Sequence, residues 1–243
     1  MARPGPRDRA ARDTLRTEIL PDPGAVAARA AERIARVARE AVTVRGRCAL
    51  AISGGTTPWQ AFGALAGEDV PWERVHLFQV DERVAPSGDP ERNFLHLKDA
   101  LIDRIPIPPA NVHPMPVEEE DLDAGARSYE AILRRITGTP PVLDLVQLGL
   151  GEDGHTASLF PGDPALQVLD ADVVVSGLYK GRRRMTLTFP VIDRARCLLW
   201  LVTGAGKATT LARLRAGDRS IPAGRVLRCR AFLLADAAAG GAG

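Results

Sequence analysis

The sequence predicts an α/β fold in which helices cover both faces of a mostly parallel sheet. Apolar strand-like runs alternate with helical patterns along the chain, as in βαβ units. These runs do not alternate in polarity, which is typical of strands buried on both faces. No shift in composition marks a domain boundary. We therefore expect an arginine-rich mobile tail over residues 1–18, one domain over 19–236 and a frayed end over 237–243.

The first helix is predicted to begin after Asp22-Pro23, because apolar residues then recur every three or four positions. The residues on this face are Val26, Ala30, Ile34, Val37 and Ala41. Residues 47–52 form a short apolar run that predicts a buried strand, ended by Ser53-Gly54-Gly55. Pro58 suits the first turn of the helix that follows.

The rest of the chain repeats this alternation of strand and helix. Further strands are predicted at residues 75–80, 143–150, 173–175, 185–189, 197–202 and 230–234. Further helices are predicted at residues 94–105, at 122–136 and from 204–207 to about Arg215, with an extended piece at 111–115. In parallel sheets ligands bind beyond the carboxyl ends of the strands, so four strand-end segments are the candidate sites.

Composition excludes several classes of protein. The 32 basic and 30 acidic residues leave a net charge of +2, which argues against nucleic-acid binding through bulk charge. The apolar run at 197–202 is far shorter than the ~20 residues that span a bilayer, and the first 20 residues carry no secretory signal. We expect a cytoplasmic protein with no membrane or nucleic-acid partner. Three cysteines, Cys48, Cys197 and Cys229, predict buried thiols rather than disulfides or a zinc site.

The first two strand ends carry groups suited to anions. The first is a glycine-containing turn before a helix, where backbone N–H groups can approach a phosphate: Ser53, Gly54, Gly55 and Thr56. A simple turn with a hydroxyl N-cap is the alternative. At the second, Arg83 can bind a phosphate or carboxylate bidentately, oriented by Asp81 or Glu82. A solvated loop with a local ion pair is the alternative there.

The third strand end, residues 148–162 with the sequence LGLGEDGHTASLFPG, carries the strongest signal. Its glycine-rich turn places Asp153 and His155 at the mouth of a buried strand, where a histidine can act as a general base oriented by the carboxylate. A surface histidine is the alternative. At the fourth, Lys207 is one of only three lysines and begins a helix, which suits a second anion contact. Arg184 is the member of the nearby basic run that we expect to point inward.

Motifs for other chemistries are absent from the sequence. It has no P-loop, no G-x-S-x-G, no H-E-x-x-H and no G-x-G-x-x-G dinucleotide fingerprint. The four histidines are scattered without metal-ligand spacing. The sequence therefore predicts neither a metal nor a cofactor.

In this order, the four segments resemble the 6-phosphogluconolactonase family of the glucosamine-6-phosphate isomerase/6-phosphogluconolactonase superfamily, over about residues 20–235. The matching runs are SGGT at 53–56, DER at 81–83, LG and GEDGHTASLFPG within 148–162, RMTLT at 184–188, TG at 203–204 and KA at 207–208. Two places depart from the family pattern. Val84 and Arg92-Asn93 replace a bulky residue and a Ser-Asn pair, and Lys180-Gly181-Arg182 replaces Lys-Pro-Pro.

This resemblance implies a Rossmann-like enzyme that hydrolyses 6-phospho-D-glucono-1,5-lactone to 6-phosphogluconate in the oxidative pentose phosphate pathway, without metal or nucleotide. His155 would be the base and Asp153 its orienting group. The residues implied in sugar-phosphate binding are Ser53, Gly54, Gly55, Thr56, Asp81, Arg83, Arg184 and Lys207. The alternatives are a glucosamine-6-phosphate deaminase/isomerase-like enzyme and a sugar-phosphate-binding module without catalysis. We expect a monomer, with a dimer as the alternative.

Overall fold

The computed structural model describes residues 15–241, and within this range seven strands form one sheet in the order β1-β10-β9-β6-β2-β3-β5. Every neighbouring pair of strands is parallel, which confirms the predicted parallel sheet. The strands are β1 (Arg16–Leu20), β2 (Cys48–Ile52), β3 (Val75–Gln79), β5 (Val112–His113), β6 (Leu145–Leu148), β9 (Leu198–Val202) and β10 (Ala231–Asp236).

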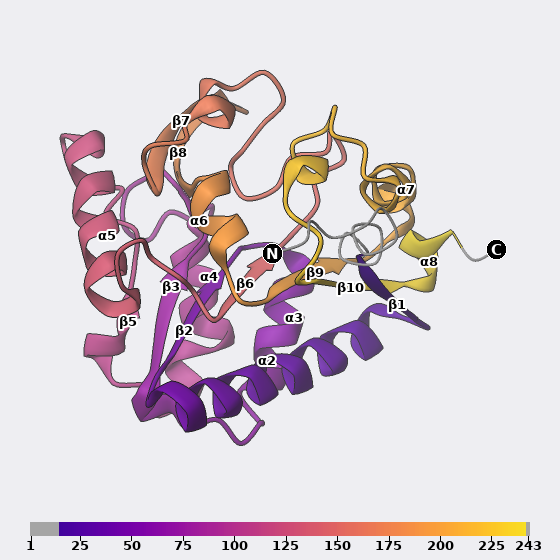
Figure 1. Ribbon diagram of the computed structural model, residues 1–243, viewed down its shortest axis with the longest axis horizontal. Coiled ribbons are helices and arrows are strands. Elements are labelled where there is room, and N and C mark those ends of the chain that lie inside the picture. Colours follow the sequence, from indigo (N-terminus) through magenta and orange to yellow (C-terminus); the bar gives the residue numbers. More distant parts are fainter. Residues whose placement is uncertain (1–14, 242–243) are drawn as a thin grey trace, which may run out of the picture.

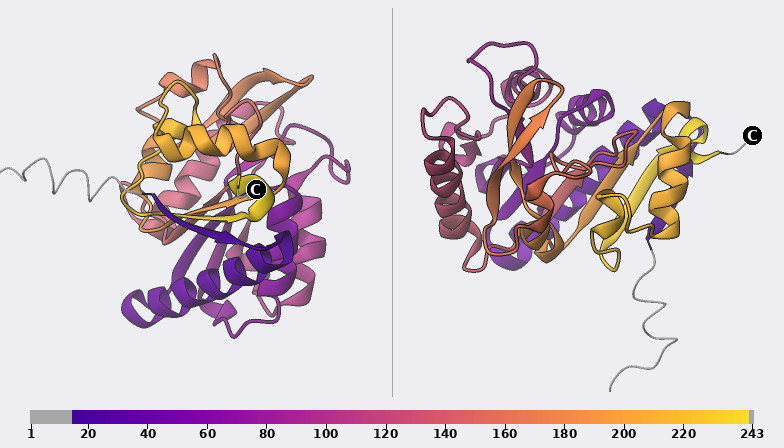
Figure 2. Two further views of the ribbon diagram at one scale, coloured as in Figure 1. Left: turned by 90° about the vertical axis from the view of Figure 1, so that its right-hand side faces the viewer. Right: turned by 90° about the horizontal axis from the view of Figure 1, so that it is seen from above.

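Helices cover both faces of this sheet (Figures 1 and 2). They are α2 (Pro23–Arg45), α3 (Thr56–Leu65), α4 (Asn93–Ala100), α5 (Leu122–Thr137), α6 (Phe189–Arg194), α7 (Ala208–Ala216) and α8 (Ala237–Gly240). Leu50 of β2 packs in the same cluster as Ile34 of α2, whereas its neighbours Ala49 and Ala51 pack with Tyr129 of α5. Successive side chains of a strand point to opposite faces, so each apolar residue of β2 is buried by a helix layer.

A second, three-stranded antiparallel sheet lies beside the first and was not predicted. Its strands, in spatial order, are β4 (Asp81–Arg83), β8 (Arg182–Leu187) and β7 (Val173–Tyr179). Val80 joins the two sheets, because its N–H donates to Ile52 O and its C=O accepts from Leu187 N, both at 2.8 Å. The segment predicted as a strand-end loop at 81–83 is therefore a strand. In Figure 1, β7 and β8 stand in the upper part of the molecule.

Both predicted chain ends are shorter than expected. β1 pairs with β10 from Arg16 to Leu20, so the predicted tail is wrong for residues 16–18, whose backbone extends the edge of the sheet. Residues 237–240 form α8 instead of fraying, because the Asp236 side chain accepts a hydrogen bond from Ala239 N at the helix start. Residues 1–14 and 242–243 of the predicted ends lie outside the described part of the chain.

Several internal boundaries also differ. α4 ends at Ala100 and a short 3-10 helix follows at Ile102–Arg104, while Ile105 is extended because it precedes Pro106. The strand predicted at 143–150 spans only Leu145–Leu148, and the extended piece only Val112–His113. Cys48 and Cys197 are buried as predicted, but Cys229 is exposed. None of the helices between residues 15 and 241 has the length and apolar character needed to cross a bilayer.

The order of the strands fixes where the sheet opens. β2 and β6 are neighbours, but the chain continues from β2 to β3 on one side and from β6 to β9 on the other. In doubly wound sheets the crevice lies at such a reversal, beyond the carboxyl ends of the two strands. The first and third predicted strand-end segments begin here, at Ser53 and Gly149.

Candidate active site

A cavity of ≈ 330 Å³ lies at this reversal and gathers residues from all four predicted strand ends. Among the predicted site residues, those that line it are Ser53, Gly54, Gly55, Thr56, Asp81, Arg83, His155, Arg184 and Lys207. Asp153 does not line the cavity, but its carboxylate forms a hydrogen bond with His155, which does. The parallel sheet supplies residues 53–56 and His155, whereas the small antiparallel sheet supplies Asp81, Arg83 and Arg184.

Asp153 and His155 form a hydrogen-bonded pair, with Asp153 Oδ1 2.5 Å from His155 Nδ1. The same oxygen accepts the backbone N–H of His155 at 3.1 Å. Because the carboxylate engages Nδ1, it favours the tautomer in which Nε2 is free to accept a proton. The pair therefore has the arrangement of a general base and its orienting carboxylate.

The glycines of the GEDGH turn make room for this pair. A Cβ on Gly151 would lie 2.1 Å from His155 Nδ1 and 2.6 Å from Asp153 Oδ1. Gly154 has a φ of +87°, and a Cβ there would lie 2.5 Å from Ile221 Cβ. Any side chain at these two positions would displace the histidine or the turn that carries it.

The environment of the pair favours a neutral His155 imidazole and a charged Asp153 carboxylate. Burial lowers the pKa of His155 below its usual value of 6.5, against the opposing effect of the Asp153 and Asp81 carboxylates. Arg184 acts in the same direction as burial. Burial alone would raise the pKa of Asp153, but hydrogen bonds from His155 and from Tyr179 lower it overall.

The loop after β2 is held by side chains from neighbouring elements. Gly54 packs so closely on Asn93 that a Cβ would lie 1.9 Å from Asn93 Oδ1, and Gly55 has a φ of +128°. Ser53 is held by Gln147, since Ser53 N donates to Gln147 Oε1 and Ser53 Oγ to Gln147 O. The Ser53 hydroxyl proton is therefore engaged within the protein. The N–H groups at the start of α3 and the Thr56 hydroxyl are the donors that remain for a ligand.

Arg83 and Arg184 face each other as register partners on β4 and β8. Like charges directly opposite each other on antiparallel strands are destabilising unless an anion or carboxylate neutralises them. Within residues 15–241, the buried Nε atoms of both arginines have no hydrogen-bond partner. Burial, together with the charge of Arg83, lowers the pKa of Arg184, while nearby Asp81 opposes this. The pair thus brings two positive charges to the wall of the cavity.

Lys207 and Asp81 both line the cavity. Lys207 lies at the junction between a 3-10 helix and α7, and its Nζ is 3.9 Å from Glu152 Oε1, too far for a hydrogen bond. Asp81 is buried and its Oδ2 accepts a 2.7 Å hydrogen bond from Ser158 Oγ. This bond ties β4 to the loop that carries His155.

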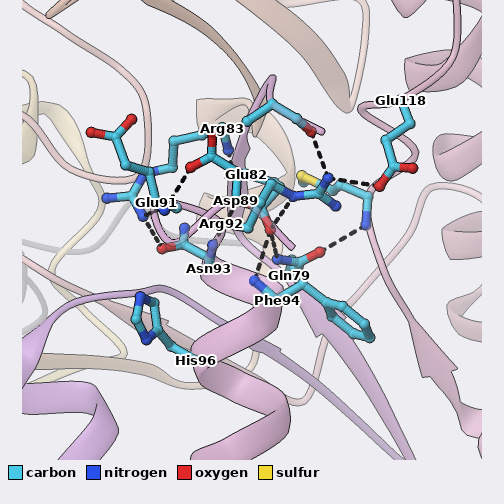
Figure 3. Close-up of polar contacts among 12 residues, drawn as sticks. Gln79, Glu82, Arg83, Asp89, Glu91, Arg92, Asn93, Phe94, His96 and Glu118 are labelled. Atoms are coloured by element: carbon cyan, nitrogen blue, oxygen red, sulfur yellow. Dashed lines mark hydrogen bonds and ion pairs between the residues drawn. The ribbon is translucent and has the colours of Figure 1, made fainter. Parts of the chain in front are cut away.

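Glu82 orients the backbone of Arg83 rather than its guanidinium (Figure 3). Its fully buried carboxylate accepts the backbone N–H groups of Arg83, Asn93 and Phe94 at 2.7–2.8 Å and pairs with Arg92 Nε at 3.3 Å. Gln79 Nε2 donates to it as well, at 2.9 Å. The carboxylate thereby caps the N-terminus of α4, although Glu82 itself lies in strand β4.

Sequence reasoning missed two residues that this arrangement uses. Asn93 donates to Asp81 O through Nδ2 and accepts from Arg83 Nη1 through Oδ1, so it links the first and last residues of β4. The sequence did offer a signal for Asn93, because it belongs to the Arg92-Asn93 pair at which the chain departs from the family pattern. Tyr179 donates to Asp153 Oδ2 across 26 residues of sequence, and no local pattern marks such a contact.

Comparison with known proteins defines the class to which this fold and site belong. Residues 21–234 match the sequence model of the glucosamine-6-phosphate isomerases/6-phosphogluconolactonase family, and the chain belongs to that family. It is 42% identical to a 6-phosphogluconolactonase of Synechocystis sp. over 74% of this chain and 76% of that protein. It is 38% identical to a 6-phosphogluconolactonase of Nostoc sp. over 92% of this chain and 96% of that protein.

Solved structures agree with this assignment. The crystal structure of 6-phosphogluconolactonase from Thermotoga maritima matches with a TM-score of 0.81 and 27% identity, covering 91% of this chain and 98% of that one. A monomeric glucosamine-6-phosphate deaminase matches with a TM-score of 0.82 but only 19% identity, covering 93% of this chain and 99% of that one. The second likeness shows a shared fold alone.

Removal of the Glu82 carboxylate is expected to destabilise the protein strongly. Glu82→Ala leaves Arg92 without its buried partner and three backbone N–H groups without an acceptor, so the free energy of unfolding should fall by about 3–5 kcal/mol. Denaturant unfolding measures this loss. Glu118→Ala is the matched control, since Glu118 pairs with the same Arg92 but is 52% exposed. It should cost less than about 1 kcal/mol. Equal losses in the two variants would contradict the role assigned to Glu82.

Proposed function

We propose that this protein hydrolyses 6-phospho-D-glucono-1,5-lactone to 6-phosphogluconate, a step of the oxidative pentose phosphate pathway. One observation carries the proposal: a carboxylate-oriented histidine shares a single cavity with two arginines that face each other across paired strands and with a glycine turn at a helix start. A phosphorylated lactone needs these two things together, a base for water and a site for a dianion. Relatives at 38–42% identity that carry the name of this activity support the same conclusion.

The part of the cavity around His155, the base half, carries out the chemistry. His155 Nε2 takes a proton from a water molecule, and the water oxygen attacks the lactone carbonyl carbon. The tetrahedral oxyanion then collapses, the bond from that carbon to the ring oxygen breaks, and the imidazolium returns the proton to the departing oxygen. Asp153 stabilises the imidazolium in between. The lactone already opens in water, so assistance of about 10²–10⁴-fold is an adequate catalytic contribution.

The part of the cavity around Arg83, Arg184 and Lys207, the cationic half, holds the phosphate. Arg83 and Arg184 line the cavity with their positive charge, and the loop at residues 53–56 offers backbone N–H groups at the start of α3. Lys207 adds a further positive charge at the cavity wall. One chain supplies groups for both ends of the substrate, which supports a monomer as the acting unit.

A coupled assay tests this function directly. Purified protein should accelerate the conversion of the lactone to 6-phosphogluconate, followed by a dehydrogenase that reduces a nicotinamide cofactor. His155→Ala should lower kcat by about 100- to 10,000-fold with a smaller effect on KM. A variant with near-wild-type kcat would remove His155 from the mechanism. Conversion of glucosamine 6-phosphate instead, or binding of the sugar phosphate without turnover, would favour one of the alternative functions.

The pH dependence of the reaction follows from the lowered pKa of His155. Only the neutral imidazole accepts a proton from water, so kcat/KM rises with pH through this pKa and is flat above it. Because burial holds the pKa below 6.5, the midpoint should lie below pH 6.5. The measurement uses unphosphorylated D-glucono-1,5-lactone, which has no phosphate to titrate, between about pH 4.5 and 7.5 with the spontaneous rate subtracted. A midpoint above 6.5 would contradict the assignment.

Lys207→Ala tests the phosphate site. A lysine contact to an ionised phosphate is a charge-assisted bond, so its loss should raise KM for the phosphorylated lactone by about tenfold or more. Hydrolysis of the unphosphorylated lactone should hardly change, because that substrate has no phosphate to lose. Equal impairment of both substrates in a folded protein, or no effect on either, would place Lys207 outside the site.

A further inference from the structure

Tyr179 lies at the end of β7, where the β7–β8 hairpin turns back over the loop that carries His155. The turn residues Lys180 and Gly181 both have positive φ values, +51° and +81°, as in the tight two-residue turns of hairpins. The register of the hairpin shifts between Ser176 and Tyr179. Such a shift changes the face to which later side chains point, so the hairpin does not simply continue the alternation of β7.

The Tyr179 ring is fixed by stacking. It lies parallel to the buried Phe160 ring, with centroids 3.7 Å apart and 7° between the planes. The His155 ring contacts both, with centroid distances of 4.9 Å to Phe160 and 5.5 Å to Tyr179. The Arg184 guanidinium lies 5.4 Å from the Tyr179 centroid on the same wall. The stack therefore holds the hairpin against the base.

The Tyr179 hydroxyl completes the hydrogen bonding of Asp153. It donates to Asp153 Oδ2 at 3.1 Å, while Oδ1 is occupied by His155 Nδ1 at 2.5 Å. A carboxylate held through one oxygen can still rotate about its Cβ–Cγ bond, whereas donors on both oxygens fix its plane. The histidine ring that depends on this carboxylate is fixed with it.

We propose that Tyr179 is a positioning residue of the base, which acts on His155 through Asp153 and does not itself touch the reacting atoms. This inference rests on the proposed function of the Asp153–His155 pair. It assigns a task to the hydroxyl, separate from the stacking of the ring. A purely structural tyrosine would need only the ring, because Tyr179 is half-buried and its hydroxyl bonds to nothing in the core.

Tyr179→Phe separates the two contributions, since it keeps the stack on Phe160 and removes only the hydroxyl. A hydrogen bond to a charged group is lost, so kcat should fall by about five- to tenfold with KM changed less than about twofold. Leu178→Ala is the matched control on the same hairpin, because Leu178 is 76% exposed and should leave both constants unchanged. An unchanged kcat in Tyr179→Phe would overturn the proposal.

A double-mutant cycle tests whether the hydroxyl acts through Asp153. In the Asp153→Ala background the hydroxyl has no carboxylate to hold, so adding Tyr179→Phe should change kcat by less than about twofold. The same five- to tenfold loss in that background would mean that Tyr179 acts by another route, and would overturn the proposal.

An NMR titration of His155 tests the same contact without substrate. Asp153, Asp81 and Arg184 are the charged groups around this ring, and all three stay in place in Tyr179→Phe. Without the hydroxyl, Asp153 shares its charge with His155 alone, so the pKa of His155 should rise, whereas Leu178→Ala should not move it. An unchanged pKa in Tyr179→Phe overturns the proposal even if the wild type is an active lactonase. A raised pKa in a protein without lactonase activity supports the Tyr179 contact and refutes the proposed function.

Discussion

The Glu82 carboxylate is completely buried, and its two oxygens meet donors from three successive pieces of the chain. A buried charge is tolerated only when it is paired and fully hydrogen-bonded, so these pieces can adopt few other arrangements. Glu82 lies in β4, just after the chain passes from β3 into the antiparallel sheet. Its carboxylate binds the N-terminus of α4 there. Arg83 and Asn93 are bonded directly to it through their backbone N–H groups, and the cationic half of the cavity is built on them.

The cavity exists because two sheets of different type meet at one edge. The parallel sheet presents loops and helix starts at the carboxyl ends of its strands, which is where N–H groups and short turns are available. The antiparallel sheet presents side chains from paired strands, which sets Arg83 opposite Arg184. The Asp81–Ser158 hydrogen bond joins the two halves across 77 residues of sequence. Strand pairing therefore fixes the two arginines relative to each other, and the Asp81–Ser158 side-chain hydrogen bond ties their sheet to the loop that carries His155.

The charges around His155 are opposed in sign, as its proposed role requires, because a base must gain and lose a proton in one turnover. Burial and Arg184 favour the neutral imidazole, while Asp153 and Asp81 favour the imidazolium. A strong bias in either direction would slow proton uptake or proton return. The rings of Phe160 and Tyr179 pack against the His155 ring, and the Tyr179 hydroxyl hydrogen-bonds to the Asp153 carboxylate.

The sequence by itself determined the parallel sheet, its helix layers and the strand-end residues at 53–56, 153–155 and 207, because apolar periodicity and glycine turns are local signals. Tertiary structure alone decided that Asp81–Arg83 is a strand and that residues 16–18 pair with β10. It also decided the contacts of Glu82 and the reach of Tyr179 to Asp153. Strand register and side-chain contacts between distant segments depend on the folded arrangement of both partners, and nothing in either local sequence records the other.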